Sequence, residues 1–582
     1  MPTSARSSHR QARAWPCGHR GPFRSVASAV TVAVLLLGAS LSAQTADTPT
    51  GGAVAGEAAG PALAGTDASR AEILRGTYSR HRANNDVLHY DLAVRVEPDR
   101  QYVSGRNRIR FRMLVDDTRI QLDLHDNLAV DGILLDGRRL DFSREAHTVF
   151  VDFRRVLRAG ETYEIEFRYS GTPLGQGRFG GMAFRRDGAG RHWVTTANED
   201  EGASLWWPCK DQWLDEPDGV DVTIEAPADL VAVSNGRLIE TRQVEGDYRR
   251  WHWRVSAPIN AYNVSLNLAA YTHIADRREA LTLDYYVIPE NADRARAHFA
   301  QVLPMLDAFE HYVGPFPFPE DGYKLVEVPY AGMEHQSAIA YGNRFANGYL
   351  ERDWTGVGIS PRFDFIIVHE SAHEWFGNAV TAADVSDMWI HEGWATYLEA
   401  VYVEHRFGTD DALRYVNALK DKVRHDAPVL TTRGLHRVPP SDMYFKGALL
   451  LHTLRGVVGD DARWWDLVRG VYARFRYQTL LTEDLVGFVN GQLGRDLTPM
   501  FDQYLRHTAL PTLELRFDES AGTVSYRWRA DVAGFRMPVL VGRREAWTRL
   551  EATTEWQTAP NTLAPERFDV ATDRFYIDVE KR

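Results

Sequence analysis

Hydrophobic and polar residues alternate along the N-terminal half of the chain. Residues 90–96 and 109–113 place an apolar side chain at every second position. This period of two predicts half-buried β-strands. Similar short stretches, separated by turn signals such as DGR and SNG, continue to about residue 288. Residues 75–288 are therefore predicted to form a β-rich domain, either a sandwich or a saddle-shaped sheet.

The spacing of apolar residues becomes helical beyond Pro289. Amphipathic runs occupy residues 292–314, 363–377, 387–408 and 483–494, and several of them end in Gly. Apolar residues three and four positions apart, followed by Gly, are typical of helices and their C-terminal caps. Asp387 is a candidate N-cap of the third helix. We expect a mainly α-helical domain over residues 289–510.

Alternation returns after Pro511 and predicts a small β-domain over residues 511–582. The fold class expected from these patterns is multidomain α+β. The length of 582 residues agrees with several domains, each large enough to bury a core.

The first residues of the chain have the pattern of an export signal. Five arginines and no acidic residue precede the apolar run VASAVTVAVLLLGASLSA, which ends in small residues near Ala43. A basic stretch, a short apolar core and small residues describe a secretory signal peptide over residues 1–43; an uncleaved anchor is the alternative. Residues 44–74 are rich in Ala, Gly, Thr and Pro and are predicted to be a flexible linker.

These features predict an exported protein, periplasmic or extracellular, with no stable membrane span after signal removal. Of the two cysteines, only Cys209 remains after removal of the signal, so no disulfide within the mature chain is expected. Lys and Arg number 67 against 79 Asp and Glu, a net charge of −12. That balance argues against a nucleic-acid-binding groove, which needs clustered basic residues.

His369, Glu370 and His373 spell H-E-x-x-H within one predicted helix. Four residues turn an α-helix through about 400°, so both imidazoles lie on one face, one turn apart. Two neutral imidazoles at that spacing can bind one Zn²⁺, and Glu370 beside them can take a proton from water. The alternative is a pair of helix-face histidines satisfied by hydrogen bonds.

Glu392 is the candidate third ligand. It lies near the start of the next predicted helix, and a helix–loop–helix hairpin returns its carboxylate to the face of the first helix. The sequence HEWFGNAVTAAD lacks the further Gly and His of a metzincin. Zinc is favoured over iron, because the iron triad would not need Glu370. We expect one Zn²⁺ per chain.

The segments HESAHEWFGNAVT and DMWIHEGWATYLEA resemble the aminopeptidase N family of gluzincin metallopeptidases, which includes leukotriene hydrolase. VLHYDLAVRV and YVSGRNRIRF are similar to the opening strands of its N-terminal β-saddle, and MYFKGALLLHTLR resembles its Y-x-K-G segment. The resemblance extends from about residue 85 to the C-terminus. It implies a β-saddle domain followed by a thermolysin-like catalytic domain.

The segment VPYAGMEHQSAIAYGN is similar to the G-x-M-E-N substrate loop of that family. The resemblance assigns substrate binding to Gly332, Met333 and Glu334, with the Glu334 carboxylate pairing with the substrate's free α-amino group. The loop departs from the common pattern: Ala331 stands where Gly is usual, and His335 replaces Asn. How this changes the loop's contact with the peptide stays open.

Two further residues are assigned through the resemblance. Glu199, in the acidic stretch NEDE, lies where relatives place a residue that shares the amine; a solvated acidic turn is the alternative. Tyr444 matches the tyrosine that hydrogen-bonds the oxyanion of the tetrahedral intermediate; a core tyrosine is the alternative.

The sequence therefore predicts a zinc-dependent aminopeptidase whose partners are peptides with a free N-terminus. Glu370 and Tyr444 are the expected catalytic residues. Two alternatives remain: a thermolysin-like endopeptidase with the same metal ligands, and a non-catalytic protein that keeps zinc for stability and binds peptides. The preferred N-terminal residue, the physiological substrate and the oligomeric state cannot be inferred from the sequence.

Overall fold

The computed structural model describes residues 67–176, 180–199 and 201–582. The predicted signal peptide, residues 1–43, lies outside these residues, as does most of the predicted linker, residues 44–74. The end of that linker differs from the prediction, because it forms helix α1 (Arg70–Gly76). Ser69 Oγ accepts the backbone N–H of Glu72, and the Glu72 carboxylate accepts the backbone N–H of Ser69. This capping box, S-x-x-E, fixes the start of the helix.

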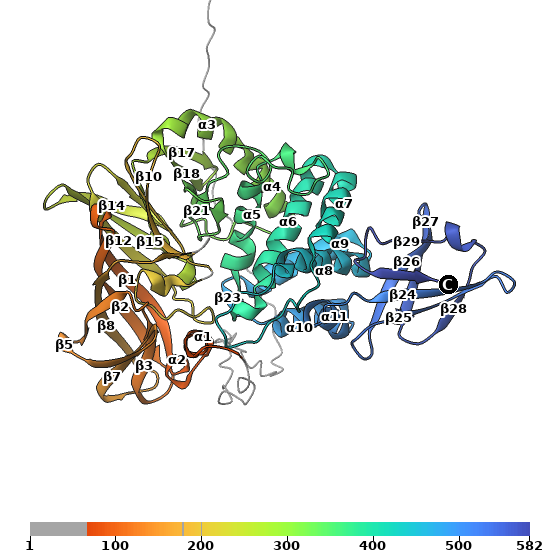
Figure 1. The fold of residues 1–582 in the computed structure, drawn as a ribbon, viewed down its shortest axis with the longest axis horizontal. Coiled ribbons are helices and arrows are strands. Elements are labelled where there is room, and N and C mark those ends of the chain that lie inside the picture. Colours follow the sequence, from red (N-terminus) through yellow and green to blue (C-terminus); the bar gives the residue numbers. More distant parts are fainter. Residues whose placement is uncertain (1–66, 177–179, 200) are drawn as a thin grey trace, which may run out of the picture. The chain divides into compact units, whose positions relative to one another are not determined.

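A large mixed sheet forms the centre of the N-terminal domain (Figure 1). Eight strands follow one another in the order β14 (Arg237–Val244), β15 (Tyr248–Val255), β12 (Val220–Pro227), β1 (Asn85–Glu97), β2 (Tyr102–Met113), β8 (Thr162–Gly171), β4 (Leu128–Leu135), β5 (Arg138–Arg139). Alternate residues of β1 are buried, including Leu92, Val94 and Val96. The predicted half-buried strands are confirmed there.

Two smaller sheets complete this domain. One contains β13 (Val231–Val233), β16 (Asn267–Ala269), β11 (His192–Ala197), β10 (Gly180–Arg186), β9 (Gly175–Gln176). The other contains β3 (Asp117–Asp123), β7 (Thr148–Leu157), β6 (Asp141–Glu145). Their inner faces share one hydrophobic core with the large sheet, which includes Trp206, Trp207 and Cys209. The short helix α2 (Arg80–Ala83) precedes β1.

Helices make up most of the next domain. They are α3 (Ala292–His298), α4 (Val302–Tyr312), α5 (Phe365–Ala372), α6 (Trp389–Phe407), α7 (Thr409–Ala418), α8 (Asp442–Val458), α9 (Asp461–Phe475), α10 (Thr482–Leu493), α11 (Thr498–Arg506). Helices α6 and α8 cross where Gly393 meets Gly447, and a Cβ added to Gly393 would lie 3.1 Å from the Cα of Gly447. This close crossing brings the N-terminal halves of both helices together.

A five-stranded sheet packs beside these helices, in the order β17 (Thr272–Arg278), β18 (Leu281–Val287), β19 (Tyr323–Glu327), β21 (Ile339–Tyr341), β20 (Gly332–Met333). Strand β18 pairs in parallel with β19. The first two strands were predicted within the N-terminal domain, residues 75–288. Their pairing joins them to the sheet of the helical domain, which the period-two pattern alone could not indicate. A short parallel pair, β22 (Val380–Ala382) and β23 (Gln478–Leu480), lies elsewhere in this domain.

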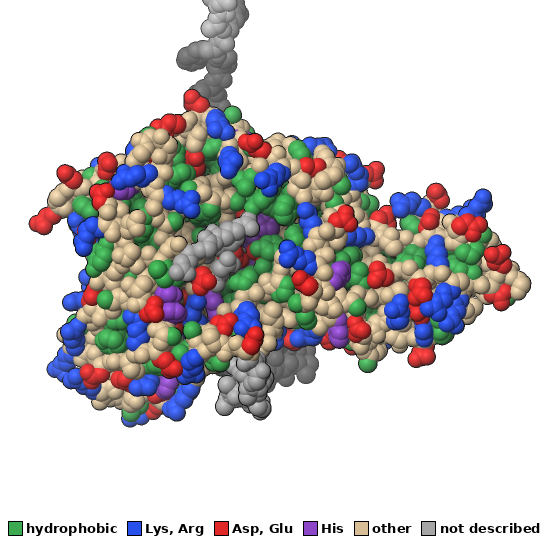
Figure 2. Space-filling model, viewed as in Figure 1, with side chains coloured by type: hydrophobic (Ala, Val, Ile, Leu, Met, Phe, Trp, Pro, Cys, Tyr) green, Lys and Arg blue, Asp and Glu red, His purple; other side chains and the backbone are tan. Residues whose placement is uncertain are grey.

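The C-terminal segment forms two small sheets, as the alternation after Pro511 predicts. One contains β28 (Gln557–Pro560), β25 (Thr523–Arg529), β24 (Thr512–Asp518), β30 (Asp578–Lys581); the other contains β27 (Ala546–Thr553), β26 (Arg536–Arg543), β29 (Asp569–Val570). The expected multidomain α+β fold is therefore confirmed. None of the helices among the described residues has both the length and the apolar character required to cross a bilayer. On the face drawn in Figure 2, basic and acidic side chains are interspersed.

Candidate metal centre and substrate site

His369, His373 and Glu392 meet at the junction of helices α5 and α6. The Nε2 atoms of the two histidines are 3.4 Å apart, and the Glu392 Oε2 atom lies 3.3 Å from the first and 3.4 Å from the second. Ligand atoms bound at about 2.0–2.1 Å around a tetrahedral zinc ion are about 3.3–3.4 Å apart. Glu392 Oε2 is buried and has no hydrogen-bond donor among the described residues. The three residues therefore fit one Zn²⁺.

The ring orientations of both histidines are fixed through their other nitrogens. His369 Nδ1 lies 2.7 Å from Glu399 Oε1, and His373 Nδ1 lies 3.1 Å from the carbonyl oxygen of Phe376. Both partners are acceptors, so each ring donates from Nδ1 and presents the lone pair of Nε2 to the metal. Tyr415 donates to the second Glu399 oxygen at 2.6 Å.

Glu399 was missed by the sequence analysis. It follows Glu392 by seven residues on α6, so it lies on the same helix face two turns later. That spacing was the available signal.

Electrostatics within the cluster favour an ionised third ligand. Burial opposes ionisation of Glu392, yet the adjacent His373 and His369 hold its pKa below its usual range. Burial also raises the pKa of the neighbouring Glu370 to about 8. A dication held by the triad would act against that rise, because it stabilises a nearby negative charge.

Glu370 lies against the substrate loop. A Cβ added to Gly332 would lie 2.5 Å from Glu370 Oε1 and 2.8 Å from the Ile366 side chain. Strand β20, which is Gly332–Met333, therefore runs so close to α5 that a side chain at position 332 would displace those of Glu370 or Ile366. The resemblance assigns Gly332 to substrate binding, and its contact with Glu370 was not predicted from the sequence.

Glu334 follows β20 and points at the same centre. Donor atoms of Glu334, Glu370 and His373 all lie within 4.8 Å of one another. The Tyr262 hydroxyl donates to Glu334 Oε1 at 3.1 Å, and Asn378 Nδ2 donates to the Glu334 carbonyl oxygen at 2.8 Å. Burial raises the pKa of Glu334, and the negative charge of Glu392 adds to the rise.

The N-terminal domain contributes directly to this substrate side. Tyr262 belongs to the 3₁₀ turn η4 (Ala261–Asn263), and Asn263 donates from Nδ2 to Asn378 Oδ1 at 2.8 Å. The Oδ1 atom of Asn263 accepts the backbone N–H of Gln336 at 3.2 Å. The substrate loop is therefore held from both domains, and Tyr262 and Asn263 had no motif in the sequence.

Glu199 is buried in the turn that follows β11. Its charge adds to the effect of burial in raising the pKa of both Tyr262 and Tyr444, so it lies on the same side of the site as these rings. Arg75 of helix α1 donates to the carbonyl oxygen of Glu201 and so anchors the turn. Glu199 is therefore buried near these two tyrosines and does not belong to a solvated acidic turn.

Tyr444 reaches the centre from helix α8. Its ring centroid is 6.2 Å from that of His369, with 28° between the ring planes. Burial, together with the charges of Glu392, Glu199 and Glu334, raises its pKa well above the usual value. The phenol is therefore a hydrogen-bond donor beside the metal ligands.

His335 is enclosed next to Glu334. Burial lowers its pKa to about 3, and neither ring nitrogen has a hydrogen-bond partner among the described residues. The ring is neutral at ordinary pH and leaves one donor and one acceptor unsatisfied.

The fold and the triad define a protein with a candidate zinc centre of the H-E-x-x-H type and a glutamate as third ligand. Comparison with known families then places it. Residues 87–263 match the peptidase M1 N-terminal domain, and residues 298–504 match the peptidase family M1 domain. The chain belongs to the M1 peptidase family, and the resemblance found in the sequence is confirmed. The cofactor of this zinc metallopeptidase family is zinc.

Its relatives in this family are distant. Aminopeptidase 2 of Candida albicans is 22% identical over 458 residues, which are 74% of this chain and 48% of that protein. Aminopeptidase N of Canis lupus familiaris is 23% identical over 415 residues, which are 65% of this chain and 41% of that protein. The chain thus spans about half the length of the curated relatives it matches.

Solved structures support the fold. The M1 zinc metallopeptidase of Deinococcus radiodurans has a TM-score of 0.62 at 22% identity, covering 74% of this chain and 96% of that one. A mutant of that protein bound to a Tyr-Ser-Ala substrate has a TM-score of 0.61 at 23% identity, covering 75% of this chain and 98% of that one.

Proposed function

We propose that this protein is a zinc-dependent aminopeptidase that removes the N-terminal residue of peptides. The observation that carries the proposal is the position of Glu334, whose carboxylate lies within 4.8 Å of donor atoms of Glu370 and His373. A carboxylate there can pair with an α-ammonium group. The carbonyl carbon of the first residue is only about 2.5 Å from that nitrogen, so the first peptide bond falls beside Glu370.

Each residue then has a defined task. Zn²⁺ held by His369, His373 and Glu392 would polarise the scissile carbonyl and acidify water. Glu370 accepts the proton of the attacking water and delivers it to the leaving amine. Tyr444 donates a hydrogen bond to the oxyanion that develops on the carbonyl oxygen.

Binding of the peptide uses the other half of the site. Glu334 holds the ammonium group, and Glu199 shares it from the opposite domain. The backbone of Gly332 and Met333 lies along the peptide, next to Glu370. Substrates are accordingly peptides with a free N-terminus.

A panel of single-amino-acid fluorogenic amides tests this function. We expect hydrolysis that stops in the presence of a zinc chelator, returns with added Zn²⁺, and is absent for the N-acetylated form of each amide. Equal hydrolysis of the acetylated amides or cleavage within capped peptides would favour the endopeptidase alternative. A zinc-loaded protein that cleaves none of the panel but binds free peptides would favour the non-catalytic alternative.

We also propose that the protein is exported, to the periplasm or outside the cell. The support is the basic and then apolar pattern of residues 1–43. N-terminal sequencing of protein recovered outside the cytoplasm should begin after Ala43. A start at Met1 on membrane-associated protein would favour the uncleaved anchor instead.

A further inference from the structure

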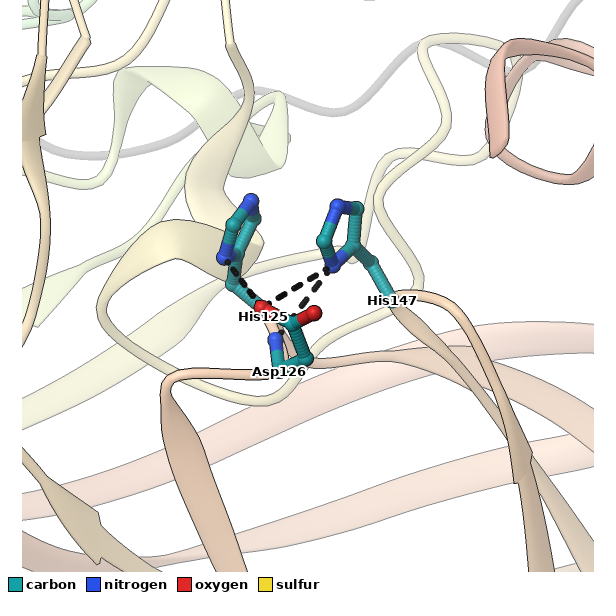
Figure 3. Close-up of side chains that lie close together, drawn as sticks. All are labelled: His125, Asp126 and His147. Carbon is teal, nitrogen blue, oxygen red and sulfur yellow. Dashed lines mark hydrogen bonds and ion pairs between the residues drawn. The ribbon is translucent and has the colours of Figure 1, made fainter. Parts of the chain in front are cut away.

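A second group of metal-ligating side chains lies in the N-terminal domain, apart from the catalytic site. His125 and Asp126 follow strand β3, and His147 lies between β6 and β7 (Figure 3). Strands β3 and β7 are antiparallel neighbours that end opposite each other, at the pair Asp123 and Thr148. The backbone N–H of Leu124 donates to the His147 carbonyl oxygen at 2.8 Å, which holds the two turns together.

The distances between these side chains resemble those of a metal site. Asp126 Oδ1 lies 3.3 Å from His125 Nδ1 and 3.7 Å from His147 Nδ1, and Figure 3 shows both nitrogens facing this oxygen. The corresponding separations among the catalytic ligands are 3.3–3.4 Å. The histidine side chains are 13% and 19% exposed and that of Asp126 is 63% exposed, so solvent can complete a coordination shell on one side.

The imidazole rings of the two histidines lie face to face. Their rings stack with centroids 3.6 Å apart and 15° between planes, a contact at which two imidazolium cations repel each other. Neutral imidazole needs no deprotonation before it binds a divalent ion.

Another His–Asp–His group in the same domain shows the contrast. His89 Nε2 and His252 Nε2 lie 3.0 and 2.6 Å from separate oxygens of Asp221, and Arg254 Nε lies 2.9 Å from one of them. These are hydrogen-bond lengths, and the guanidinium already neutralises the carboxylate. In this group the carboxylate oxygens are already occupied by hydrogen bonds, and it serves as a matched control.

We propose that His125, Asp126 and His147 form a second divalent-metal site, selective for zinc-class ions that accept nitrogen and oxygen ligands. The ion replaces two contacts of the free state: the Asp126 N–H to His147 Nδ1 at 3.3 Å, and the His125 Nδ1 to Asn127 Oδ1 at 2.8 Å. Because the rings are parallel, the lone pairs of their Nδ1 atoms point in similar directions. The rings must therefore rotate apart before both lone pairs can point at one ion. The bound ion cross-links the turn after β3 to the turn between β6 and β7.

Metal content of the full chain tests this proposal. The protein is stripped with a chelator, reloaded with Zn²⁺, desalted and analysed for zinc per chain. We expect two ions in the wild type, one in His125→Asn/His147→Asn, and one in His369→Asn/His373→Asn. The control His89→Asn/His252→Asn should keep two. A single ion in the wild type, or two in the first double variant, would overturn the proposal.

A milder variant separates loss of the site from loss of the fold. Asp126→Asn removes only an exposed charge, and we expect it to weaken binding of the second ion at least tenfold in a Zn²⁺ titration, with aminopeptidase activity unchanged. Co²⁺ reloading gives an independent readout, because two bound ions should give a visible absorption about twice that of the His125→Asn/His147→Asn variant. An Asp126→Asn titration identical to the wild type would also overturn the proposal.

Discussion

The metal side and the substrate side of the site are assembled differently. The metal side comes from two consecutive helices, α5 and α6, and its ligands lie on one short stretch of sequence. The substrate side combines the loop after β20 with η4 and with the turn after β11, which are far apart in the chain. Helix geometry fixes the first, whereas packing between domains fixes the second.

This difference separates the expected effects of substitution. Changes on the metal side should alter turnover or zinc affinity and leave the discrimination between free and blocked N-termini intact. Changes in the N-terminal domain at Tyr262 should alter KM and leave zinc content intact. The comparison fails if variants from both sides share one kinetic signature.

Glu370→Gln should have the largest effect. Removal of the proton acceptor should lower kcat by about 10²–10⁴-fold, the range for general acid–base catalysis. Zinc content should stay at the wild-type value, since Glu370 is not one of the three ligands. Retained activity in the zinc-loaded variant would refute the role of Glu370.

Gly332→Ala should follow, with a loss of about 10²-fold in kcat. The added Cβ would lie 2.5 Å from Glu370 Oε1, so the carboxylate must move, and small misplacements of a catalytic group cost about this much. The matched control is Gly487→Ala on helix α10, where an added Cβ meets no atom within 4 Å. Wild-type activity of Gly332→Ala would show that the loop backbone, rather than the Glu370 carboxylate, moves to accommodate the added methyl group.

Glu399→Gln should weaken zinc binding by about 10–100-fold, the usual effect of losing a carboxylate that orients a ligating histidine. Competition with a chromophoric chelator measures the change. Glu404→Gln, on the same helix, removes a carboxylate that pairs with Arg455 rather than with a ligand, and it should bind zinc as the wild type does. Equal zinc affinities of the two variants would show that Glu399 does not support zinc binding.

These contrasts also explain what the sequence could predict. The meeting of His369, His373 and Glu392 follows from the helical repeat and one hairpin, so the motif was sufficient to predict that these side chains lie together. Gly332, Tyr262 and Asn263 act through contacts between segments distant in the chain, and no local pattern reports such contacts. Glu399 lay within reach of the sequence, because its seven-residue spacing from Glu392 places both on one face of α6.

Two errors of the sequence analysis have local causes. Asp387 was predicted to cap α6, but α6 begins at Trp389 after a 3₁₀ turn (Val385–Asp387) that Asp384 caps. The Asp387 carboxylate instead pairs with Arg433 and accepts the backbone N–H of Thr482. The linker was predicted from the Ala, Gly, Thr and Pro content of residues 44–74. That composition does not reflect the capping box at the start of α1.

Tyr262→Phe should weaken substrate binding without changing the metal side of the site. The hydroxyl donates to Glu334, and loss of one such hydrogen bond costs about 1 kcal/mol, which corresponds to about a fivefold rise in KM. We expect kcat and zinc content to change little. Tyr169→Phe is the control, since that buried hydroxyl has no hydrogen-bond partner among the described residues. A fall in kcat with KM unchanged would place Tyr262 on the metal side.

The effect expected at His335 is on stability rather than on catalysis. A buried histidine whose folded-state pKa is about 3 stays neutral while the unfolded chain takes up a proton below pH of about 6.5, so acid favours unfolding. At pH 5.5 this linkage lowers the free energy of unfolding by about 1.4 kcal/mol, and none of that loss is present above pH 7.5. His335→Asn places the common family residue there. Between pH 7.5 and 5.5, its free energy of unfolding should therefore fall by about 1.4 kcal/mol less than that of the wild type. Chemical denaturation at both pH values measures the difference, with the exposed His311 replaced by Asn as the control. Parallel pH profiles for wild type and His335→Asn would show that the ring gains a partner or solvent that the structure does not give it.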